Sequence, residues 1–421
     1  MKTNVPEIRF QGFEEEWETL EYKDLFSKLS NNSLSRDELN YSSGSAKNVH
    51  YGDVLIKFSE ILDIKTEILP YINDSEIVMK YITSKLRDGD IVMADAAEDE
   101  TVGKCTELVN VKNETILAGL HTIAIRPEID FASLYLGYYL NSDQYHSQLL
   151  RLMQGTKVSS ISNTALRDTI ISFPSDKSEQ TKIGSYFKNL DRLITLKQRK
   201  LDKLKNVKKS MLEKMFPREG AAVPEIRFQG FSGEWERKTL GEVTLKIGDG
   251  LHGTPTYHDN GEFYFINGNN LIDGKISVFK DTRRVNEDAL FSDDKELNEN
   301  TILLSINGTI GNLALYLGEK VMLGKSVAYL MLNKVYKLYM FYVLQNSCIK
   351  QYFFSNLTGS TIKNLGLETI RKTCLLIPIQ IEEQTKIGNY FKNLDRLISL
   401  QQKEIEKLKQ IKSSCLSKMF V

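Results

Sequence analysis

The chain has 421 residues and a mass of 48.1 kDa, a length that suits two or three domains with a core each. Its 55 basic residues balance its 55 acidic residues and 41% of its residues are hydrophobic, a composition that excludes a disordered or fibrous protein. No apolar run is long enough to span a bilayer, and the first ten residues contain no apolar signal region, so we expect a cytoplasmic protein that contacts no membrane.

The first element in chain order is a short phrase that occurs twice. VPEIRFQGFEEEWE at residues 5–18 returns as VPEIRFQGFSGEWE at residues 223–236, with differences at two positions only. Such a match indicates an internal duplication. We interpret both copies as docking segments that begin each half of the chain, with Trp17 and Trp235 as aromatic anchors.

The regions that follow the docking segments, residues 19–130 and 237–334, share almost no sequence. Both variable domains alternate short apolar strands with turns rich in Gly, Asn, Ser, Thr and Lys, and the side chains of Asn, Ser, Thr and Lys hydrogen-bond base edges and phosphates. Because loops of any globular domain are rich in the same residue types, composition alone does not establish a nucleic-acid site. These turns lie at residues 42–48 and 155–162 in the first half, and at 249–258, 267–270, 307–312 and 359–364 in the second.

Each half closes with a long predicted helix, at residues 180–216 and 384–420, and 25 of the 37 positions are identical. Pro174 and Pro378 end the strands that precede these helices. Apolar residues recur at steps of three and four, which is the heptad pattern of a coiled coil. The predicted seam consists of Phe187, Leu190, Ile194, Leu201, Leu204, Met211 and Met215 in the first helix and Phe391, Leu394, Ile398, Ile405, Leu408, Cys415 and Met419 in the second.

Two helices with matching seams favour packing against each other, although an amphipathic helix packed on its own domain is the simpler alternative. We expect an antiparallel pair related by a pseudo-twofold axis, because a duplicated unit relates to itself most simply in this way. The pair then joins the two variable domains as a rod, and Val421 returns close to Met1, so that the chain is quasi-circular. Polar residues at core-type positions fix the register at a cost in stability; they are Lys197, Lys208, Gln401 and Lys412.

The repeated helices carry most of the positive charge. Residues 180–216 contain 11 basic and 3 acidic residues, and residues 384–420 contain 8 and 3. The rest of the chain is therefore acidic overall. A solvated helix face explains most of these lysines without a nucleic-acid partner.

Motifs for catalysis or metal binding are not recognisable in the sequence. The four cysteines and five histidines form neither a zinc-ligand spacing nor a disulfide framework. GDGLHG at residues 248–253 matches a G-x-G-x-x-G pattern, but Pro255, Asn260 and Gly261 follow where a dinucleotide site needs a helix. We therefore expect no catalytic, cofactor-binding or metal-binding residue in this chain.

The whole chain resembles the specificity subunit of type I restriction-modification enzymes. The resemblance lies in the repeated EQTKIG-x-YFKNLDRLI helices, the GTKVSSIS and GSTIKNLG segments that precede them, the docking segments, and DGLHGTPTY with NGTIGN. It implies an α+β fold in which two mixed α/β target recognition domains are joined by an antiparallel helix pair. The predicted boundaries are residues 1–175 and 217–379 for the domains, and 176–216 and 380–421 for the spacer helices.

The resemblance also implies a function. Each target recognition domain would read one half of a split, asymmetric double-stranded DNA site in the major groove, and the helix pair would set the spacer and dock two modification subunits that methylate adenine. S-adenosylmethionine, ATP and Mg would be used by these partners and by the restriction subunits, so this chain would be non-catalytic. The candidate DNA contacts are Lys47, Asn48, Lys57 and Lys157 in the first domain and His252, Thr254, Tyr257, Asn267, Asn269, Lys325 and Lys363 in the second.

Two other classes of protein remain open from the residues themselves. One is a coiled-coil adaptor whose end domains bind proteins, and the other is a fragment of a fused enzyme. A gel shift on duplex DNA distinguishes the adaptor from a DNA reader, and methyl transfer by the purified chain identifies a fused enzyme.

Overall fold

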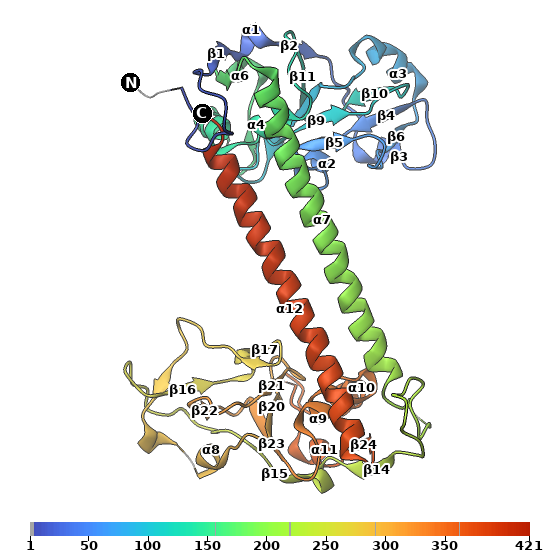
Figure 1. The fold of residues 1–421 in the computed structure, drawn as a ribbon, viewed down its shortest axis with the longest axis vertical. Helices are drawn as coiled ribbons and strands as arrows, with labels where there is room; N and C mark the ends of the chain where they lie inside the picture. The colour runs from blue at the N-terminus through green and yellow to red at the C-terminus, as the bar shows by residue number, and fades with distance from the viewer. Residues whose placement is uncertain (1–3, 156, 219, 291, 362) are drawn as a thin grey trace. The chain divides into compact units, whose positions relative to one another are not determined.

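The structure is a computed structural model that describes residues 4–155, 157–218, 220–290, 292–361 and 363–421 (Figure 1). Its contacts divide the chain into two compact units. The first unit contains the residues up to Gln198 together with Lys403–Val421, and the second contains Arg199–Gln402. Each unit therefore combines one domain with parts of both long helices, whereas the prediction treated the helices as separate segments.

The first unit is built on mixed sheets, as the predicted α+β class requires. A five-stranded sheet has the order β2-β11-β7-β9-β5, and a four-stranded sheet has the order β10-β4-β6-β3. The strands are β1 Glu18–Glu21, β2 Phe26–Leu29, β3 Leu39–Asn40, β4 Ala46–Val49, β5 Ile61–Asp63, β6 Tyr71–Ile72, β7 Ile91–Ala94, β8 Ala96–Ala97, β9 Cys105–Val109, β10 Ile116–Ala118, β11 Thr122–Pro127, β12 Ser159–Ser160 and β13 Ile170–Phe173. The short helices are α1 Tyr22–Leu25, α2 Tyr51–Ile56, α3 Ser75–Tyr81, α4 Tyr135–Tyr139, α5 Asp143–Leu150 and α6 Asn163–Leu166, with 3-10 turns at Arg36–Glu38 and Ile82–Ser84.

The second unit has a four-stranded sheet of order β15-β23-β20-β21 and a three-stranded sheet of order β19-β16-β22. Its strands are β14 Glu236–Thr239, β15 Thr244–Asp249, β16 Phe263–Ile266, β17 Leu271–Ile272, β18 Lys275–Ile276, β19 Arg284–Val285, β20 Thr301–Ser305, β21 Leu313–Leu315, β22 Val321–Leu323, β23 Val327–Leu332 and β24 Cys374–Ile377. Its short helices are α8 Ser292–Glu296, α9 Lys337–Val343, α10 Ser347–Ser355 and α11 Leu367–Arg371, and its 3-10 turns are η3 Gly241–Val243, η4 Gly268–Asn270 and η5 Glu287–Ala289.

The two units repeat one topology despite their dissimilar sequences. In the first unit β4 pairs with β10 in parallel and β7 pairs with β11 in antiparallel fashion; in the second, β16 pairs with β22 and β20 with β23 in the same two ways. The strands that precede the long helices, β13 and β24, pair with β1 and β14, which follow the docking segments. The duplication inferred from the repeated phrases therefore extends through the variable regions as well.

The long helices are α7 Lys177–Lys214 and α12 Ile381–Lys418, each of 38 residues. Both begin soon after the prolines that end β13 and β24, as predicted. Each helix has one glycine, at the same repeat position. A side chain there would collide with the start of α4 in the first unit and with α9 in the second. A Cβ at Gly184 would lie 3.0 Å from the Leu134 Cβ, and one at Gly388 would lie 2.8 Å from the backbone nitrogen of Tyr339.

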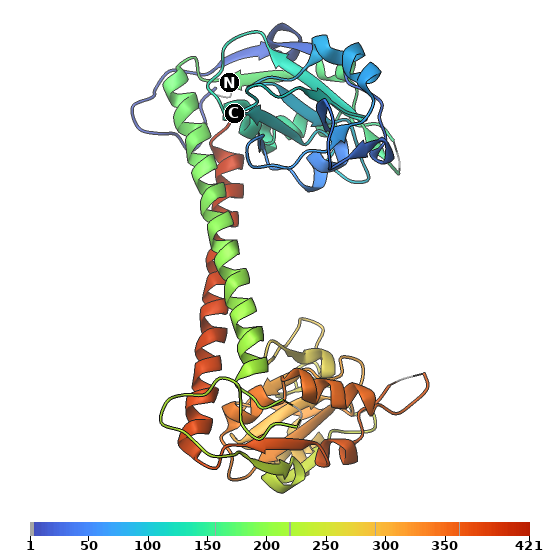
Figure 2. The ribbon, with the colours of Figure 1, turned by 90° about the vertical axis from the view of Figure 1, so that its right-hand side faces the viewer.

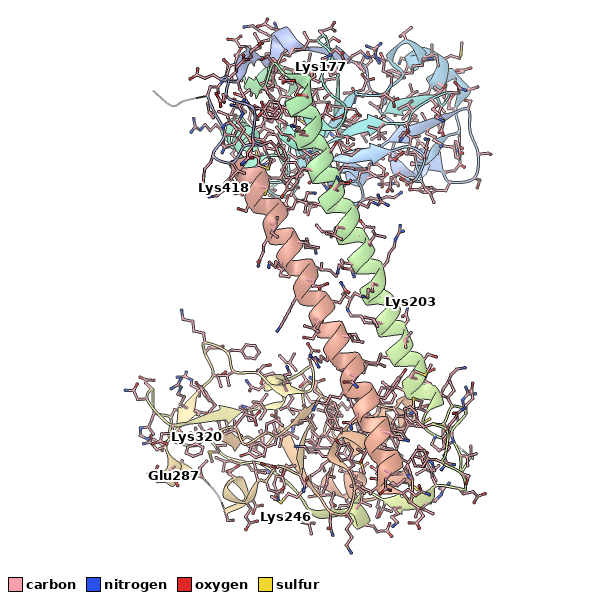
Figure 3. The ribbon with its side chains drawn as sticks, in the orientation of Figure 1. Lys177, Lys203, Lys246, Glu287, Lys320 and Lys418 are labelled. Carbon is pink, nitrogen blue, oxygen red and sulfur yellow. The ribbon has the colours of Figure 1, made fainter. Side chains whose placement is uncertain are left out.

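In the first unit, the docking segment joins the start of α7 to the end of α12. Arg9 donates from Nε and Nη2 to the two carboxylate oxygens of Glu179 at 2.7 and 2.8 Å, and Glu179 is 1% exposed. The backbone N–H of Ile8 donates to the carbonyl of Lys418 at 2.9 Å. Figure 3 marks Lys177 at the start of α7 and Lys418 near the end of α12, both in this unit.

An aromatic cluster closes this junction. Phe420, just past the end of α12, stacks on Phe187 of α7 at 5.7 Å between ring centroids and contacts Trp17 edge-on at 6.4 Å. All three rings are buried, so the anchor role predicted for Trp17 is confirmed. The last residues of the chain thus pack against its docking segment, which confirms the quasi-circular closure; Met1 itself lies outside the described residues.

The second unit repeats the junction residue for residue with the other ends of the two helices. Arg227 binds the carboxylate of Glu383, at the start of α12, at 2.7 and 2.8 Å. Phe216, after α7, stacks on Phe391 at 5.8 Å and meets Trp235 edge-on. Each docking segment, with the Trp-Glu pair that follows it, therefore packs against a helix that ends in Lys-Met-Phe. The segment and the helix were duplicated together.

Within each unit the two helices run antiparallel, as predicted (Figure 2). In the first unit, Asp191 and Lys197 of α7 contact Lys412 and Glu404 of α12, and Phe187 contacts Phe420 just past the end of α12, so residue numbers fall along one helix as they rise along the other. The seam residues are buried or half-buried. The buried ones are Phe187, Leu201, Met215, Phe391, Leu394, Ile405 and Met419, and the half-buried ones are Leu190, Ile194, Leu204, Met211, Ile398, Leu408 and Cys415.

Candidate nucleic-acid interface

In the second unit, four turns meet at one sheet edge around Ser326. The Ser326 hydroxyl donates to the Asn267 side-chain oxygen at 3.1 Å and accepts from the Gly268 backbone N–H at 2.8 Å. The Ser326 carbonyl accepts from the N–H of Ile306 at 2.9 Å. These bonds connect the turns that follow β16, β20 and β22.

The remaining turn of this edge carries Lys363. The N–H of Leu365 donates to the Ile306 carbonyl at 2.8 Å, and the Asn307 amide donates to the Asn364 side-chain oxygen at 3.1 Å. The end of β15 joins as well, because the N–H of Leu251 donates to Leu323 at 2.8 Å. The structure therefore brings together turns that the sequence places more than one hundred residues apart.

Most of the residues predicted to contact DNA in the second unit project from these turns or from their neighbours. The exposed ones are His252, Thr254, Tyr257, Asn269, Lys325 and Lys363, and Asn267 is half-buried. His252 Nε2 lies 2.7 Å from the Asp249 carboxylate, so that one of its nitrogens is already engaged. Tyr257 packs edge-on against Phe265 and beneath the guanidinium of Arg283. The side chains available here are amides, hydroxyls and lysines, which match the groups on base edges and phosphates.

The equivalent edge of the first unit has different side chains. Here the turn after β10 contains His121, β4 is followed by His50 and by Tyr51 at the start of α2, and β7 is followed by Asp95. The Asp95 backbone N–H donates to the His121 carbonyl at 3.1 Å, and its carbonyl accepts from Ile161 at 2.8 Å. Asp95 thus links the same turns that Ile306 and Ser326 link in the second unit.

Of the residues predicted to contact DNA in the first unit, Lys157 precedes Ile161 on the turn that bonds to Asp95, whereas Lys47 and Lys57 lie away from the turns of this edge. Lys47 lies on β4 and forms an ion pair with Glu114. Lys57 follows α2 and donates from Nζ to the Ile68 carbonyl at 2.5 Å. Lys157 is exposed on the segment between Gly155 and β12.

Asn48 requires a correction. It was predicted to be an exposed turn residue, but it is a fully buried residue of β4 whose side-chain oxygen accepts from the Asn32 amide at 2.8 Å. A Cβ on Gly119 would lie 2.5 Å from the Asn48 amide nitrogen, which shows how tightly the side chain is enclosed. The polar run SSGSAKN contains the start of a strand, and polar composition alone did not reveal it. We do not retain Asn48 among the proposed contacts.

Sequence reasoning missed His50, Tyr51, Asp95 and His121 in the first unit and Ser326 in the second. None belongs to a motif, and they come from separate turns. One available signal was topological: Lys325 was proposed on the turn after β22, and the turn after β10 is its counterpart. Burial and the nearby Arg36 lower the pKa of His50, while burial raises the pKa of Asp95 against the opposing effect of His121.

A lysine clamp fixes the helix register in each unit. Lys412 of α12 binds the carboxylates of Asp191 at 2.6 Å and Glu60 at 2.8 Å, and the Tyr138 hydroxyl donates to Asp191 at 2.7 Å. Burial lowers the pKa of Lys412, but the two carboxylates outweigh it and the net shift is upward.

The second clamp has the same plan with one carboxylate fewer. Lys208 binds Asp395 at 2.7 Å, and the Tyr342 hydroxyl donates to Asp395 at 2.8 Å. Three of the polar residues predicted at core-type positions therefore form ion pairs, because Lys197 also binds Glu404 at 2.6 Å.

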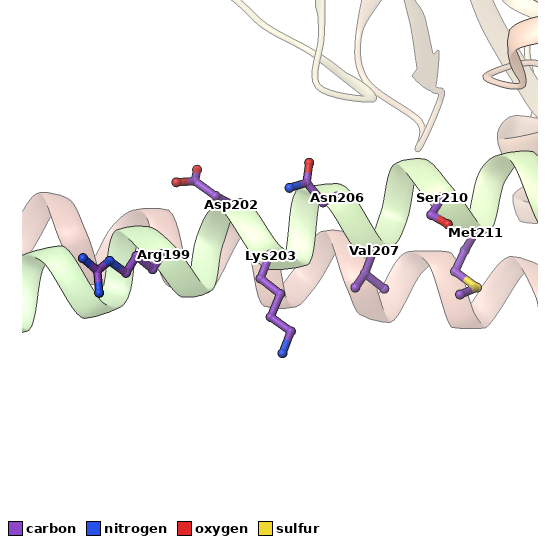
Figure 4. Close-up of a pocket in the computed structure, with 7 residues that line it drawn as sticks. All are labelled: Arg199, Asp202, Lys203, Asn206, Val207, Ser210 and Met211. Carbon is purple, nitrogen blue, oxygen red and sulfur yellow. The ribbon is translucent and has the colours of Figure 1, made fainter. Parts of the chain in front are cut away.

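The helices also present apolar side chains to solvent at matched repeat positions. Leu193 and Leu196 of α7 are 39% and 50% exposed, and Leu397 and Leu400 of α12 are 50% and 49% exposed. A shallow depression lies farther along α7, in the second unit (Figure 4). It is lined by Arg199, Asp202, Lys203, Asn206, Val207, Ser210 and Met211.

Metal and membrane features were sought in the described ranges only. There, no three His, Cys, Asp or Glu side chains gather closely enough to hold a metal ion. Within the same ranges, none of the helices combines the length and the apolar character needed to cross a membrane.

Comparison with known proteins gives consistent results. A family model described as the type I restriction modification DNA specificity domain matches residues 14–206 and again residues 232–410. The type I restriction enzyme MjaX specificity subunit of Methanocaldococcus jannaschii is 26% identical over 439 residues, which cover 99% of this chain and 94% of that protein.

Two solved structures share the fold. The S subunit of a type I restriction-modification system from M. genitalium aligns over 99% of both chains with a TM-score of 0.59 at 15% identity. A chain from a study of complex assembly and conformational transition in the type I R-M system aligns over 96% of this chain and 97% of its own length, with a TM-score of 0.56 at 17% identity.

Proposed function

Since the family model matches both units, this chain belongs to the type I restriction-modification DNA specificity family, and we propose that each unit reads one half of a bipartite, asymmetric DNA site. The family provides sequence recognition, and the chain is a non-catalytic subunit. The coiled-coil adaptor is not favoured, because the matched family covers both variable domains and not the helices alone.

One observation carries the proposal. Both units share a core strand order, to which the first unit adds β5 and β3, and the same linked turns at one sheet edge, yet most side chains on these turns differ. A fixed frame with a variable edge is what two different half-sites require, because base identity is read by side chains and the frame only positions them. The second edge offers Asn269, Lys325 and Lys363, whereas the first offers Tyr51 and His121.

We further propose that the exposed leucine pairs dock two modification subunits. Leu193 and Leu196 belong to the first unit, and Leu397 and Leu400 occupy the same repeat positions in the second. Large apolar side chains exposed on a helix mark protein contacts more often than nucleic-acid contacts. Two equivalent patches favour two copies of one partner. The α7 depression shown in Figure 4 offers the half-buried Val207 and Met211 beside basic residues, and we assign it to the same assembly.

The chemistry of the complex then lies with the partners. Modification subunits would methylate adenine with S-adenosylmethionine, and restriction subunits would use ATP and Mg to cleave DNA. Because its proposed substrate is double-stranded DNA, the complex would act in the cytoplasm. The helix pair would set the spacer between the half-sites, since its register is fixed by the lysine clamps.

The test is an exchange of residues 237–350 for the corresponding segment of a relative, followed by mapping of methylated adenines in cells that also express the modification subunits. We expect one half-site to change while the other half-site and the spacer stay as they were. An unchanged methylation sequence would contradict the proposal. Insertion of one heptad into both helices is the companion variant, and it should change the spacer with both half-sites unchanged.

A further inference from the structure

His121 has a backbone conformation that is unusual for its residue type. Its φ is +55°, in the left-handed region, and it occupies the turn between β10 and β11. A histidine there costs stability relative to glycine, and such residues concentrate at functional sites. Its side chain is 51% exposed, so neither core packing nor burial explains the choice of histidine.

The neighbours of His121 orient its ring. Nδ1 lies 3.2 Å from the Asp95 carboxylate, and the Tyr51 ring meets the imidazole edge-on at 5.3 Å between centroids. Tyr51 in turn packs on His50 at 4.7 Å. With Nδ1 assigned to Asp95, Nε2 has no hydrogen-bond partner among the residues that the structure describes.

Asp95, 28% exposed, is the carboxylate that faces the ring directly, and His50 lies beyond Tyr51 with its pKa lowered chiefly by burial. The loop after Asp95 adds the acidic residues Glu98, Asp99 and Glu100. The negative potential of DNA attracts a cationic side chain.

We propose that His121 is a specificity-determining residue that donates from Nε2 to the N7 and O6 edge of a guanine in the first half-site. This inference rests on the proposed reading of DNA by the first unit. Asp95 is its positioning residue. Guanine is the base that presents two acceptors side by side in the major groove, whereas adenine pairs its N7 acceptor with an amino donor. With Nδ1–H bonded to Asp95, Nε2 donates only in the imidazolium, and this form of the ring, which carries N–H groups only, selects guanine.

The location supports this assignment. The β10–β11 turn is the counterpart of the β22–β23 turn that carries Lys325 in the second unit, and both lie where the parallel strand pair ends. The two units would then each place one basic side chain on this turn, His121 at the position of Ser326 and Lys325 one residue before that position. Lys47 and Lys57, by contrast, are engaged with Glu114 and Ile68 within the first unit.

The experiment uses the complex with its modification subunits and measures methylation of duplexes that vary at each half-site position. The variants are His121→Gly and His121→Asn, because both residues tolerate positive φ and keep the turn. We expect preference for guanine at one position of the first half-site to fall about tenfold, with the second half-site unchanged. His121→Gly should also raise the melting temperature, since strain is relieved.

Two further arms sharpen the result. A duplex with 7-deazaguanine at that position should weaken wild-type methylation and leave the His121→Gly complex unaffected. Asp95→Asn should weaken the guanine preference without lowering the melting temperature, whereas a purely structural role would lower the melting temperature. His146→Ala is the matched control, because His146 lies in the same unit but its ring nitrogen is bonded to the Glu100 carbonyl.

Distinct outcomes overturn distinct claims. If both His121 variants keep full guanine preference at every position, the assignment of His121 is wrong while the proposed function stands. If the wild-type complex methylates no bipartite sequence, the proposed function fails and takes the assignment with it.

Discussion

The arginine–glutamate pair at each junction permits a quantitative prediction. Glu179 is 1% exposed, and Arg9 supplies it with two short hydrogen bonds. Replacing Arg9 with Met leaves a buried carboxylate without its partner, which typically costs 3–5 kcal/mol. Glu179 occupies the first turn of α7, where the helix dipole offsets part of the loss, so we expect about 3 kcal/mol. In a domain of this size that corresponds to a decrease of roughly 6–12 °C in melting temperature.

The chain contains a matched reporter for each unit. Its two tryptophans, Trp17 and Trp235, are buried at the two junctions, one in each unit. Urea unfolding followed by fluorescence in a Trp235→Phe background reports the first junction, and unfolding in a Trp17→Phe background reports the second. We expect Arg9→Met to shift the Trp17 transition only.

Two control variants separate charge burial from packing. Arg227→Met should reproduce the loss at Trp235, because Glu383 is 2% exposed and bound in the same way. The double replacement of Arg9 and Glu179 by Met should recover most of the lost stability, since no unpaired charge remains. A loss below about 1 kcal/mol for Arg9→Met, or an equal loss in the double variant, would refute the reasoning.

Three further predictions concern the clamps, the partner surface and pH. Lys412→Met should cost about 2–3 kcal/mol by calorimetry because it leaves two carboxylates unpaired, and Lys208→Met about 1 kcal/mol because it leaves one. Glutamate at Leu193 and Leu196 should reduce co-purification of modification subunits without lowering the melting temperature. Burial raises the pKa of Glu107 to about 7. Between the usual pKa of a glutamate and this raised value, the folded chain therefore keeps a proton that the unfolded chain releases. Stability should therefore fall by up to roughly 3 kcal/mol as pH rises towards 7 and then level off.

The controls for these predictions are built into the chain. The Lys412 and Lys208 variants serve as controls for each other, and equal losses would contradict the carboxylate count. The leucine result fails if the altered chain still retains two modification subunits. For Glu107, the readout is the pH dependence of the melting temperature in wild type minus that in Glu107→Gln. This subtraction removes the opposite contribution of His50, whose lowered pKa makes stability rise with pH over a neighbouring range.

The junctions explain why the sequence repeats itself. Arg9 and Trp17 in one copy, and Arg227 and Trp235 in the other, each serve to hold the ends of two helices. These repeated residues therefore contact the ends of helices that are themselves duplicated. The domains between them are free to vary because their edge residues do not contact the junction.

The sequence by itself determined the frame. Identity between the repeats located both helices, their antiparallel pairing within each unit, the anchoring tryptophans and the strands before Pro174 and Pro378, because these features depend on local pattern and on duplication. The tertiary structure alone decided which side chains meet at the variable edges. His121 and Asp95 are 26 residues apart and Ser326 and Asn267 are 59 apart, and only the order of strands in the sheets brings each pair together. The same dependence on the sheet buried Asn48, since a polar run read as a turn becomes a strand when neighbouring strands pair with it.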